Sequence, residues 1–386
     1  MPSRVAVEAL RQRARDADLA GVVVLSPVNL RYLSGFHSNA YSRPLALVVP
    51  TEGDPTLLVP KLEEHQAHDL SWVSDVRSFV EWAEGSRAGG SIEAEFQALL
   101  TEVLGERQLL KERLGFERAA LSAIREPVLK AANPDVDWTD ISGWVEAIRL
   151  LKSAEETENH RLAARIAAVG LDAGFALARD GRSEFEIRGA AIAAASDEAA
   201  RTYPDRFVSV AGNALVGPRI AGIHAPASGT RALPTDLVFL VLSVSFEGSA
   251  CELSRTVVAG ATATPEQQRV FRAVGRAHEA ARAAAKPGTP GRDVDVAARR
   301  ALAEFDLAEY LPMRAGHGLG FGGVEGPNLG AGDGTPLASG MIISIEPGVC
   351  IPGFGGVLWA DNYLVTDGGL EQLTNYPIKL DGLSAG

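Results

Sequence analysis

The sequence predicts a mixed α/β protein made of two domains that meet near residue 150. In the first 150 residues, short apolar segments alternate with segments of helical periodicity, a pattern typical of a sheet covered by helices. Beyond residue 150 the pattern changes to long, alanine-rich amphipathic segments separated by apolar runs. The length of 386 residues fits two or three domains at roughly 150 residues each. We therefore expect domains at residues 1–150 and 151–386.

In the first domain, residues 5–17 have the spacing of an amphipathic helix. Residues 91–104 predict a second helix, and Ser91 stands where a helix cap belongs. Short apolar runs bounded by proline or glycine predict three strands, at residues 21–25, 45–49 and 56–59.

The second domain carries longer helical patterns and four further apolar runs. The predicted helices are at residues 154–177, 183–200 and 265–285. The predicted strands are at residues 236–244, 254–258, 341–345 and 363–365. Residues 316–340 hold ten glycines. Because glycine weakens helices and central strands, we expect a loop system there, of the kind that often carries function.

Composition narrows the classes of function. The net charge of −12 and the pI of about 5.2 argue against nucleic acid or an anionic membrane as a partner. The longest apolar run, residues 237–244, is much shorter than the ~20 residues that span a bilayer. The first residues lack the apolar stretch of a signal peptide, so we expect a cytoplasmic protein. Cys251 and Cys350 are too few for a disulfide framework, and we expect them to be buried packing residues.

Four segments of the second domain place a histidine or a carboxylate at a strand edge or in a glycine-rich loop. They are GIHAP at 222–226, EGSACELSRT at 247–256, AGHGLGFGGVEGP at 315–327 and SIEPGVCIPGFGGVLWAD at 344–361. Carboxylates and imidazole are the ligands that divalent cations prefer in catalytic two-metal sites. Their order and spacing resemble the metallopeptidase family that includes methionine aminopeptidase, prolidase, Xaa-Pro aminopeptidase and creatinase.

This resemblance covers about residues 148–377 and, more loosely, the first domain. It implies the pita-bread fold, in which two similar halves form a curved antiparallel sheet with helices outside. It also implies an α/β first domain of the creatinase/prolidase type.

The family's metal site is built from Asp, Asp, His, Glu and Glu, which together hold two ions. By resemblance, three of these positions keep a metal-binding side chain here, namely Glu252, His317 and Glu346. The first Asp position holds Val241 and the last Glu position holds Ala360. Neither side chain binds metal, so the resemblance implies an incomplete site that cannot hold the usual pair of ions.

One branch of the family, creatinase, works without metal, and the first domain resembles it in the segment SPVNLRYLSGF…AYSRPLALVVP. By this resemblance Tyr41 and Arg43 hold a substrate carboxylate, and His224 is the catalytic acid and base. Glu346 matches a glutamate that binds the guanidinium of creatine. The second such glutamate falls on Ser254, which speaks against creatine itself as the substrate.

Our interpretation from the sequence is a homodimeric hydrolase that cleaves a C–N bond in a small zwitterionic guanidine, amidine or amide. It needs no cofactor and uses His224, Glu252, His317 and Glu346 as catalytic residues. One alternative is an Xaa-Pro peptidase with a single divalent ion on Glu252, His317 and Glu346. Another is a non-catalytic binding protein. Each residue also has a structural alternative; for Glu252 it is an ion pair with Arg255.

Overall fold

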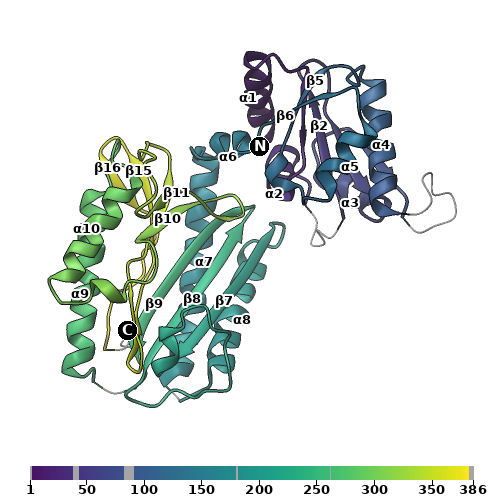
Figure 1. Cartoon of the computed structure of the whole chain (residues 1–386). Helices are drawn as coiled ribbons and strands as arrows, with labels where there is room; N and C mark the ends of the chain where they lie inside the picture. The colour runs from purple at the N-terminus through teal and green to yellow at the C-terminus, as the bar shows by residue number, and fades with distance from the viewer. Residues whose placement is uncertain (1, 38–42, 82–90, 180, 261, 382–386) are drawn as a thin grey trace. The chain divides into compact units, whose positions relative to one another are not determined.

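The computed structural model describes residues 2–37, 43–81, 91–179, 181–260 and 262–381. The chain divides into two compact units, Met1–Arg149 and Leu150–Gly386 (Figure 1). Each unit has its own buried apolar core. Within the described ranges, no helix has the length and apolar character needed to cross a membrane.

The first unit is built on a mixed six-stranded sheet with the order β4-β3-β2-β1-β5-β6. Its strands are β1 (Gly21–Val24), β2 (Ala46–Pro50), β3 (Thr56–Pro60), β4 (Asp75–Phe79), β5 (Arg113–Phe116) and β6 (Asp137–Asp140). Its helices are α1 (Pro2–Asp16), α2 (Pro27–Ser34), α3 (Glu64–Leu70), α4 (Ile92–Glu106), α5 (Arg125–Ala132) and α6 (Trp144–Arg149). The three expected strands are buried along their whole length, and Ser91 caps α4 by accepting a hydrogen bond from the Ala94 N–H.

In the second unit, two helices pack on one three-stranded antiparallel sheet. The helices are α7 (Ala154–Arg179) and α8 (Glu184–Thr202), and the strands are β7 (Val208–Val216), β8 (Leu237–Phe246) and β9 (Ser249–Val258). A Cβ on Gly170 would lie 2.3 Å from Leu242 Cδ1, and one on Gly174 would lie 2.5 Å from Leu240 Cδ2. The glycines therefore allow α7 to approach β8 closely.

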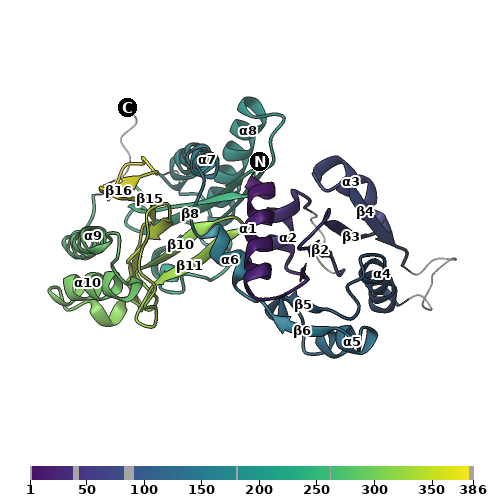
Figure 2. The ribbon, with the colours of Figure 1, turned by 90° about the horizontal axis from the view of Figure 1, so that it is seen from above.

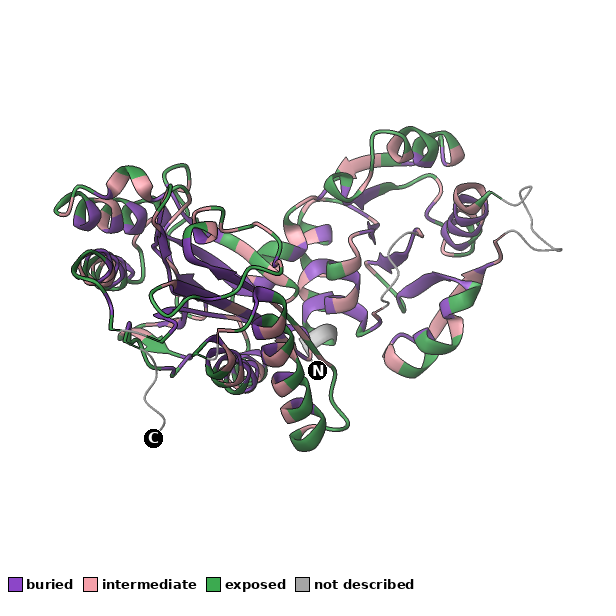
Figure 3. Ribbon diagram, turned by 90° about the horizontal axis from the view of Figure 1, so that it is seen from below, coloured by how far each residue is buried: buried purple, intermediate pink, exposed green. Residues whose placement is uncertain are grey.

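The other half of the second unit repeats this plan with another helix pair, a five-stranded sheet and a separate two-stranded sheet formed by its fourth and fifth strands. The helices are α9 (Pro265–Ala284) and α10 (Gly291–Ala303). The strands are β10 (Gly316–Gly320), β11 (Gly323–Leu329), β12 (Ile342–Ile345), β13 (Val349–Ile351), β14 (Gly355–Val357), β15 (Asp361–Thr366) and β16 (Gly369–Gln372). Every ladder between these strands is antiparallel. Both helix pairs lie outside the strands (Figure 2), whose residues are mostly buried (Figure 3).

The expected loop at residues 316–340 is wrong in its first part, because residues 316–320 and 323–329 form the antiparallel pair β10 and β11. The glycines are needed there because neighbouring strands come very close. A Cβ on Gly316 would lie 2.1 Å from the Ser344 carbonyl oxygen, and one on Gly318 would lie 1.9 Å from the Gly326 carbonyl oxygen. In this sheet glycine allows close packing of strands instead of interrupting it.

Strand β9 connects the three-stranded sheet of the second unit to its five-stranded sheet, which has the order β11-β10-β12-β15-β16. Single antiparallel bridges join Ser249 to Phe321 and Ser254 to Ala360. Because alternate residues of a strand share a face, Glu252 and Ser254 lie on the same side of β9. This junction brings β9, β10 and the end of β12 together.

Candidate functional site

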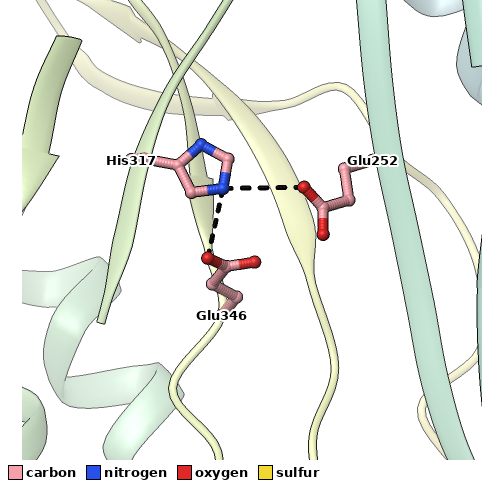
Figure 4. Close-up of side chains that lie close together, drawn as sticks. All are labelled: Glu252, His317 and Glu346. Carbon is pink, nitrogen blue, oxygen red and sulfur yellow. Dashed lines mark ion pairs between the residues drawn. The ribbon is translucent and has the colours of Figure 1, made fainter. Parts of the chain in front are cut away.

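Three side chains from distant parts of the sequence meet at this junction: Glu252 on β9, His317 on β10 and Glu346 just after β12 (Figure 4). His317 Nε2 lies 3.1 Å from Glu346 Oε1 and 3.5 Å from Glu252 Oε2. One ligand atom from each residue lies within 4.8 Å of the others. The three retained family positions thus converge on one point.

Backbone and side-chain contacts fix each of the three residues. His317 Nδ1 lies 2.9 Å from the Gly318 carbonyl oxygen, so Nε2 is left to face the carboxylates. The Asn362 side chain accepts a hydrogen bond from the Glu252 N–H and donates one to the Glu252 carbonyl oxygen. The Glu346 N–H donates to the Ala315 carbonyl oxygen at 2.9 Å. The site is therefore built on rigid strands before any ligand binds.

The charges of the three residues depend on one another. Burial alone lowers the pKa of His317, but hydrogen bonds and charge from Glu252 and Glu346 outweigh it and raise the pKa to about 10. Burial raises the pKa of Glu346, and the charge of Glu252 raises it further, while His317 acts in the opposite direction. In the ion-free protein a proton on His317 therefore partly neutralises the two carboxylates.

The three side chains open into a cavity of about 300 Å³. Its wall is mostly apolar and contains Ile223, Phe239, Val241, Met313, Val324, Leu358 and Trp359. Its remaining polar lining consists of His224, Ser254 and Arg314. This is the small end of the usual range for ligand sites, roughly 300–1,000 Å³. The cavity suits a small molecule with a few polar groups.

His224 lines this cavity from an exposed turn that follows the short 3-10 helix η3 (Gly217–Ala221). Asn213 Nδ2 donates to the Ala225 carbonyl oxygen at 2.9 Å, and Arg219 Nη2 donates to the Pro226 carbonyl oxygen at 2.7 Å. These bonds hold the chain directly after His224. The structure thus brings all four predicted catalytic residues to one cavity.

The two positions that carry no ligand lie beside the same site. Val241 on β8 lines the cavity and pairs with Ser254 across the sheet. Ala360 is only 1% exposed, and its N–H lies 3.3 Å from the Ser254 carbonyl oxygen. Arg255 is buried in an ion pair with Asp361 at 2.8 Å, so the expected alternative, Arg255 with Glu252, is not what the structure contains.

The two residues expected to bind a substrate carboxylate belong to the first unit. Arg43 Nε contacts both carboxylate oxygens of Glu81, at 2.6 and 2.8 Å. The Nε–H of Arg43 is therefore already hydrogen-bonded within the first unit. Tyr41 lies outside the described residues.

Comparison with known proteins settles the family. A model of metallopeptidase family M24 matches residues 158–367, which is more than half of the chain. The chain belongs to metallopeptidase family M24. A model of the creatinase/prolidase N-terminal domain matches residues 7–151. These matches confirm the expected pita-bread family and its fold class.

The proteins to which this M24 chain is similar include some that are named as dipeptidases and prolidases. It is 27% identical over 366 residues to the Bacillus subtilis protein named "Putative dipeptidase YkvY", covering 95% of this chain and 96% of that protein. The structure of dipeptidase PepE from Mycobacterium ulcerans is 28% identical, with a TM-score of 0.78 over 98% of this chain and 97% of that one. Prolidase from Pyrococcus furiosus is 27% identical, with a TM-score of 0.78 over 95% of this chain and 100% of that one.

The prediction that the protein needs no cofactor is wrong. It assumed that losing two ligands leaves no useful metal site, but the chain belongs to a metallopeptidase family and keeps a converging triad. The donor set fits a divalent ion, since bonds of about 2.0–2.2 Å in a tetrahedral arrangement separate ligand atoms by about 3.3–3.6 Å. The observed separations of 3.1 and 3.5 Å from His317 Nε2 are close to this.

The sequence reasoning missed Asn362 as a residue of this M24 site and gave Arg314 only a weak role, that of framing the glycine-rich loop. Asn362 holds the backbone of Glu252, and its only signal was its place directly after the Ala360–Asp361 pair. Arg314 lines the cavity, and its signal was its position three residues before His317. Both roles depend on contacts between strands that are far apart in sequence.

Proposed function

We propose that the protein is a dipeptidase that uses one divalent ion held by Glu252, His317 and Glu346. The observation that carries the proposal is the convergence of these three ligand atoms at the wall of a small cavity. Two carboxylates and a neutral imidazole carry a charge of −2, which one divalent ion balances. The dipeptidases and prolidases among the relatives favour a peptide substrate over a guanidine or amidine.

Each cavity residue has a defined task in this proposal. The chemistry supplied by a bound divalent ion is polarisation of the peptide carbonyl and acidification of a water molecule. Glu346 and Glu252 orient that water through their carboxylate oxygens. His224 transfers a proton to the amine nitrogen as the C–N bond breaks. The apolar wall around Trp359 and Leu358 excludes bulk water and packs against the substrate side chain.

The decisive experiment measures Mn²⁺ binding and hydrolysis of alanylproline on the same preparations. We expect His317→Ala to lose both, because it removes the central ligand. His224→Ala should bind Mn²⁺ normally and lower kcat by roughly 10²–10⁴-fold, the usual contribution of a general acid or base. His65→Gln, an exposed histidine of the first unit, is the matched control. Hydrolysis that persists in a chelator would reject the single-ion mechanism.

A second candidate function is binding without catalysis. Val241 and Ala360 favour it, because a site with two fewer ligands orients water less completely. In that case the metal-loaded protein binds small peptides or their analogues but releases them unchanged. A single-turnover assay with protein in excess over alanylproline separates the two candidates.

We further propose that the chain works as a homodimer with a boundary between its functional domains near residue 150. Light scattering of the purified protein tests the first point. A mass of one chain would refute it.

A further inference from the structure

We propose that Glu184 is a positioning residue, whose buried carboxylate fastens both ends of the His224 segment (residues 216–228) and thereby holds His224 at the cavity for proton transfer. This inference rests on the proposed function. Glu184 is the first residue of α8 and is fully buried. The cavity lining described above includes His224 and not Glu184, so any effect of Glu184 on catalysis has to act through the segment.

Both carboxylate oxygens of Glu184 bind the ends of the His224 segment. Near its first end, Oε1 accepts hydrogen bonds from the Val216 N–H and from Arg219 Nε, both at 2.9 Å. At its last end, Oε2 accepts hydrogen bonds from the N–H and the hydroxyl of Ser228, both at 2.7 Å. One planar group thus ties the two ends of the segment together.

Arg219 carries the restraint from Glu184 toward His224. Its Nε stays on the carboxylate, and its Nη2 donates to the Pro226 carbonyl oxygen at 2.7 Å. Because the guanidinium is planar and rigid, it fixes the separation of these two acceptors. Arg219 also balances the charge, since a buried carboxylate is unfavourable without a cation and hydrogen bonds. The backbone just after the imidazole is therefore held by the ion pair.

Helix α8 has its own cap and does not need the Glu184 carboxylate for it. An acidic side chain in the first turn of a helix is usually explained by the positive end of the helix dipole. In α8 a capping box fills that role, because Ser183 Oγ accepts from the Glu186 N–H and the Glu186 carboxylate accepts from the Ser183 N–H. The Glu184 carboxylate instead binds residues that are distant in sequence, which favours a role in the segment.

His224 needs such a restraint more than the candidate metal ligands do. Glu252 and His317 lie on strands, whereas His224 lies on an exposed turn. A general acid must stay within hydrogen-bond reach of the nitrogen that it protonates, and a displacement of about 1 Å can lower the rate about 100-fold. The Glu184 clamp gives this turn the rigidity that strands give to the metal ligands.

The test asks first whether the carboxylate matters for turnover. Glu184→Gln keeps the size of the side chain, but its amide nitrogen is a donor and cannot accept the bonds from Ser228 or Arg219. With saturating Mn²⁺ and alanylproline as substrate, we expect kcat to fall roughly 10- to 100-fold, while KM and Mn²⁺ affinity stay within about threefold of the wild type. Glu198→Gln, which loses an ion pair with Arg201 on the same helix, is the matched control and should behave like the wild type.

A double variant separates positioning from a general structural defect. In His224→Ala the proton donor is gone, so displacing its segment should have little further effect. We expect Glu184→Gln combined with His224→Ala to match the kcat of His224→Ala within about threefold. If the two losses multiply, Glu184 acts independently of His224 and the proposal is wrong. Ser228→Ala removes one donor and leaves the other bonds to Glu184, so it is a milder second variant with a smaller loss of kcat and the same dependence on His224.

Hydrogen exchange of the full-length protein tests the clamp without using activity. Peptides that cover residues 216–228 should exchange roughly 10-fold faster in Glu184→Gln than in the wild type, because their ends lose charged hydrogen bonds. Peptides of β9 and β10 should exchange equally in both proteins. Unchanged exchange in residues 216–228 would show that Glu184 does not hold the segment.

The outcomes for the two proposals are separable. Hydrolysis by the wild type, with the same kcat in Glu184→Gln, rejects the positioning role and leaves the dipeptidase function standing. An absence of hydrolysis by the wild type, together with faster exchange of residues 216–228 in Glu184→Gln, rejects the dipeptidase function and the kinetic role of Glu184 and leaves the clamp standing.

Discussion

At the scale of single residues, the same side chain behaves differently according to what surrounds it. Three buried histidines show this. Two carboxylates raise the pKa of His317 to about 10 despite its burial, whereas burial lowers the pKa of both His160 and His278 to about 4. His160 Nε2 lies 3.0 Å from the neutral amide oxygen Oδ1 of Asn362, and His278 Nε2 lies 3.9 Å from Asp361 Oδ2.

The lowered pKa of His278 predicts that the protein loses stability in mild acid. Between pH 6.5 and about 4 the unfolded chain binds a proton on this residue and the native chain does not. The free energy of unfolding therefore falls as the pH is lowered through this window, by about 3 kcal/mol for a shift of this size. Burial is the largest cause; the charge of Asp361 raises the pKa of His278, and the charges of Arg255 and Arg282 lower it.

His278→Phe keeps an aromatic ring beside Trp359 and Tyr363 and should have a shallower dependence of stability on pH. Urea unfolding at pH 7, 6, 5 and 4.5 measures this. The exposed His65→Gln is the control and should follow the wild type. If the free energy of unfolding depends equally steeply on pH in His278→Phe and in the wild type, His278 does not contribute to the loss of stability in acid.

Substitutions at positions 241 and 360 should increase the number of metal ions that the protein binds. Val241→Asp combined with Ala360→Glu should raise the number of bound Mn²⁺ ions from one to two per chain, because it supplies the two missing carboxylates. Elemental analysis after dialysis measures the count. Val241→Asn with Ala360→Gln has similar shape without the charge and should stay at one. A wild-type protein that already binds two ions would contradict the assignment of these positions.

At the scale of elements, close packing depends on residues that local propensity disfavours. Sequence patterns predicted α4, α7, α8 and α9 within a few residues of their observed ends. They missed β10 and β11, because glycine has a low strand propensity, while the fold requires glycine where a Cβ would lie about 2 Å from a neighbouring strand. Local reasoning cannot see such contacts.

The glycines of α7 give a direct test of this packing. In Gly170→Ala the new Cβ would meet Leu242 Cδ1 at 2.3 Å and the Ala191 carbonyl oxygen at 2.6 Å. We expect the free energy of unfolding to fall by about 1–3 kcal/mol, the usual penalty of overpacking. Gly189→Ala on α8 is the matched control, since nothing lies within 4 Å of its added Cβ.

At this exposed helix position, Gly189→Ala should raise the free energy of unfolding by about 0.5–1 kcal/mol, because alanine has a higher helix propensity than glycine. Thermal and urea unfolding of both variants measure the difference. Stabilisation by both substitutions would mean that α7 does not approach β8 as closely as described.

At the scale of the whole molecule, all three candidate metal ligands belong to one of the two compact units. Glu252, His317 and Glu346 lie within Leu150–Gly386, and the apolar core of Met1–Arg149 is separate. A ligand stabilises the part of a protein that binds it by mass action. We therefore expect added Mn²⁺ to slow amide hydrogen exchange in β9, β10, β12 and β15.

Exchange in β1, β2 and β5 should stay the same, which makes the first unit an internal control measured by mass spectrometry on the full chain. His317→Ala should abolish the effect. Protection spread equally over both units would show that ion binding is not confined to the second one.

The sequence by itself determined the family, the fold class and most helices and strands, and it singled out four residues that line one cavity, His224, Glu252, His317 and Glu346. It could do so because motif order, apolar periodicity and capping residues are properties of neighbouring positions. Only the tertiary structure showed that Glu252, His317 and Glu346 still converge after two ligands are lost, that Asn362 holds Glu252, and that Arg314 lines the same cavity. Distances between side chains on different strands are set by the packing of sheets and helices, and no local pattern encodes them.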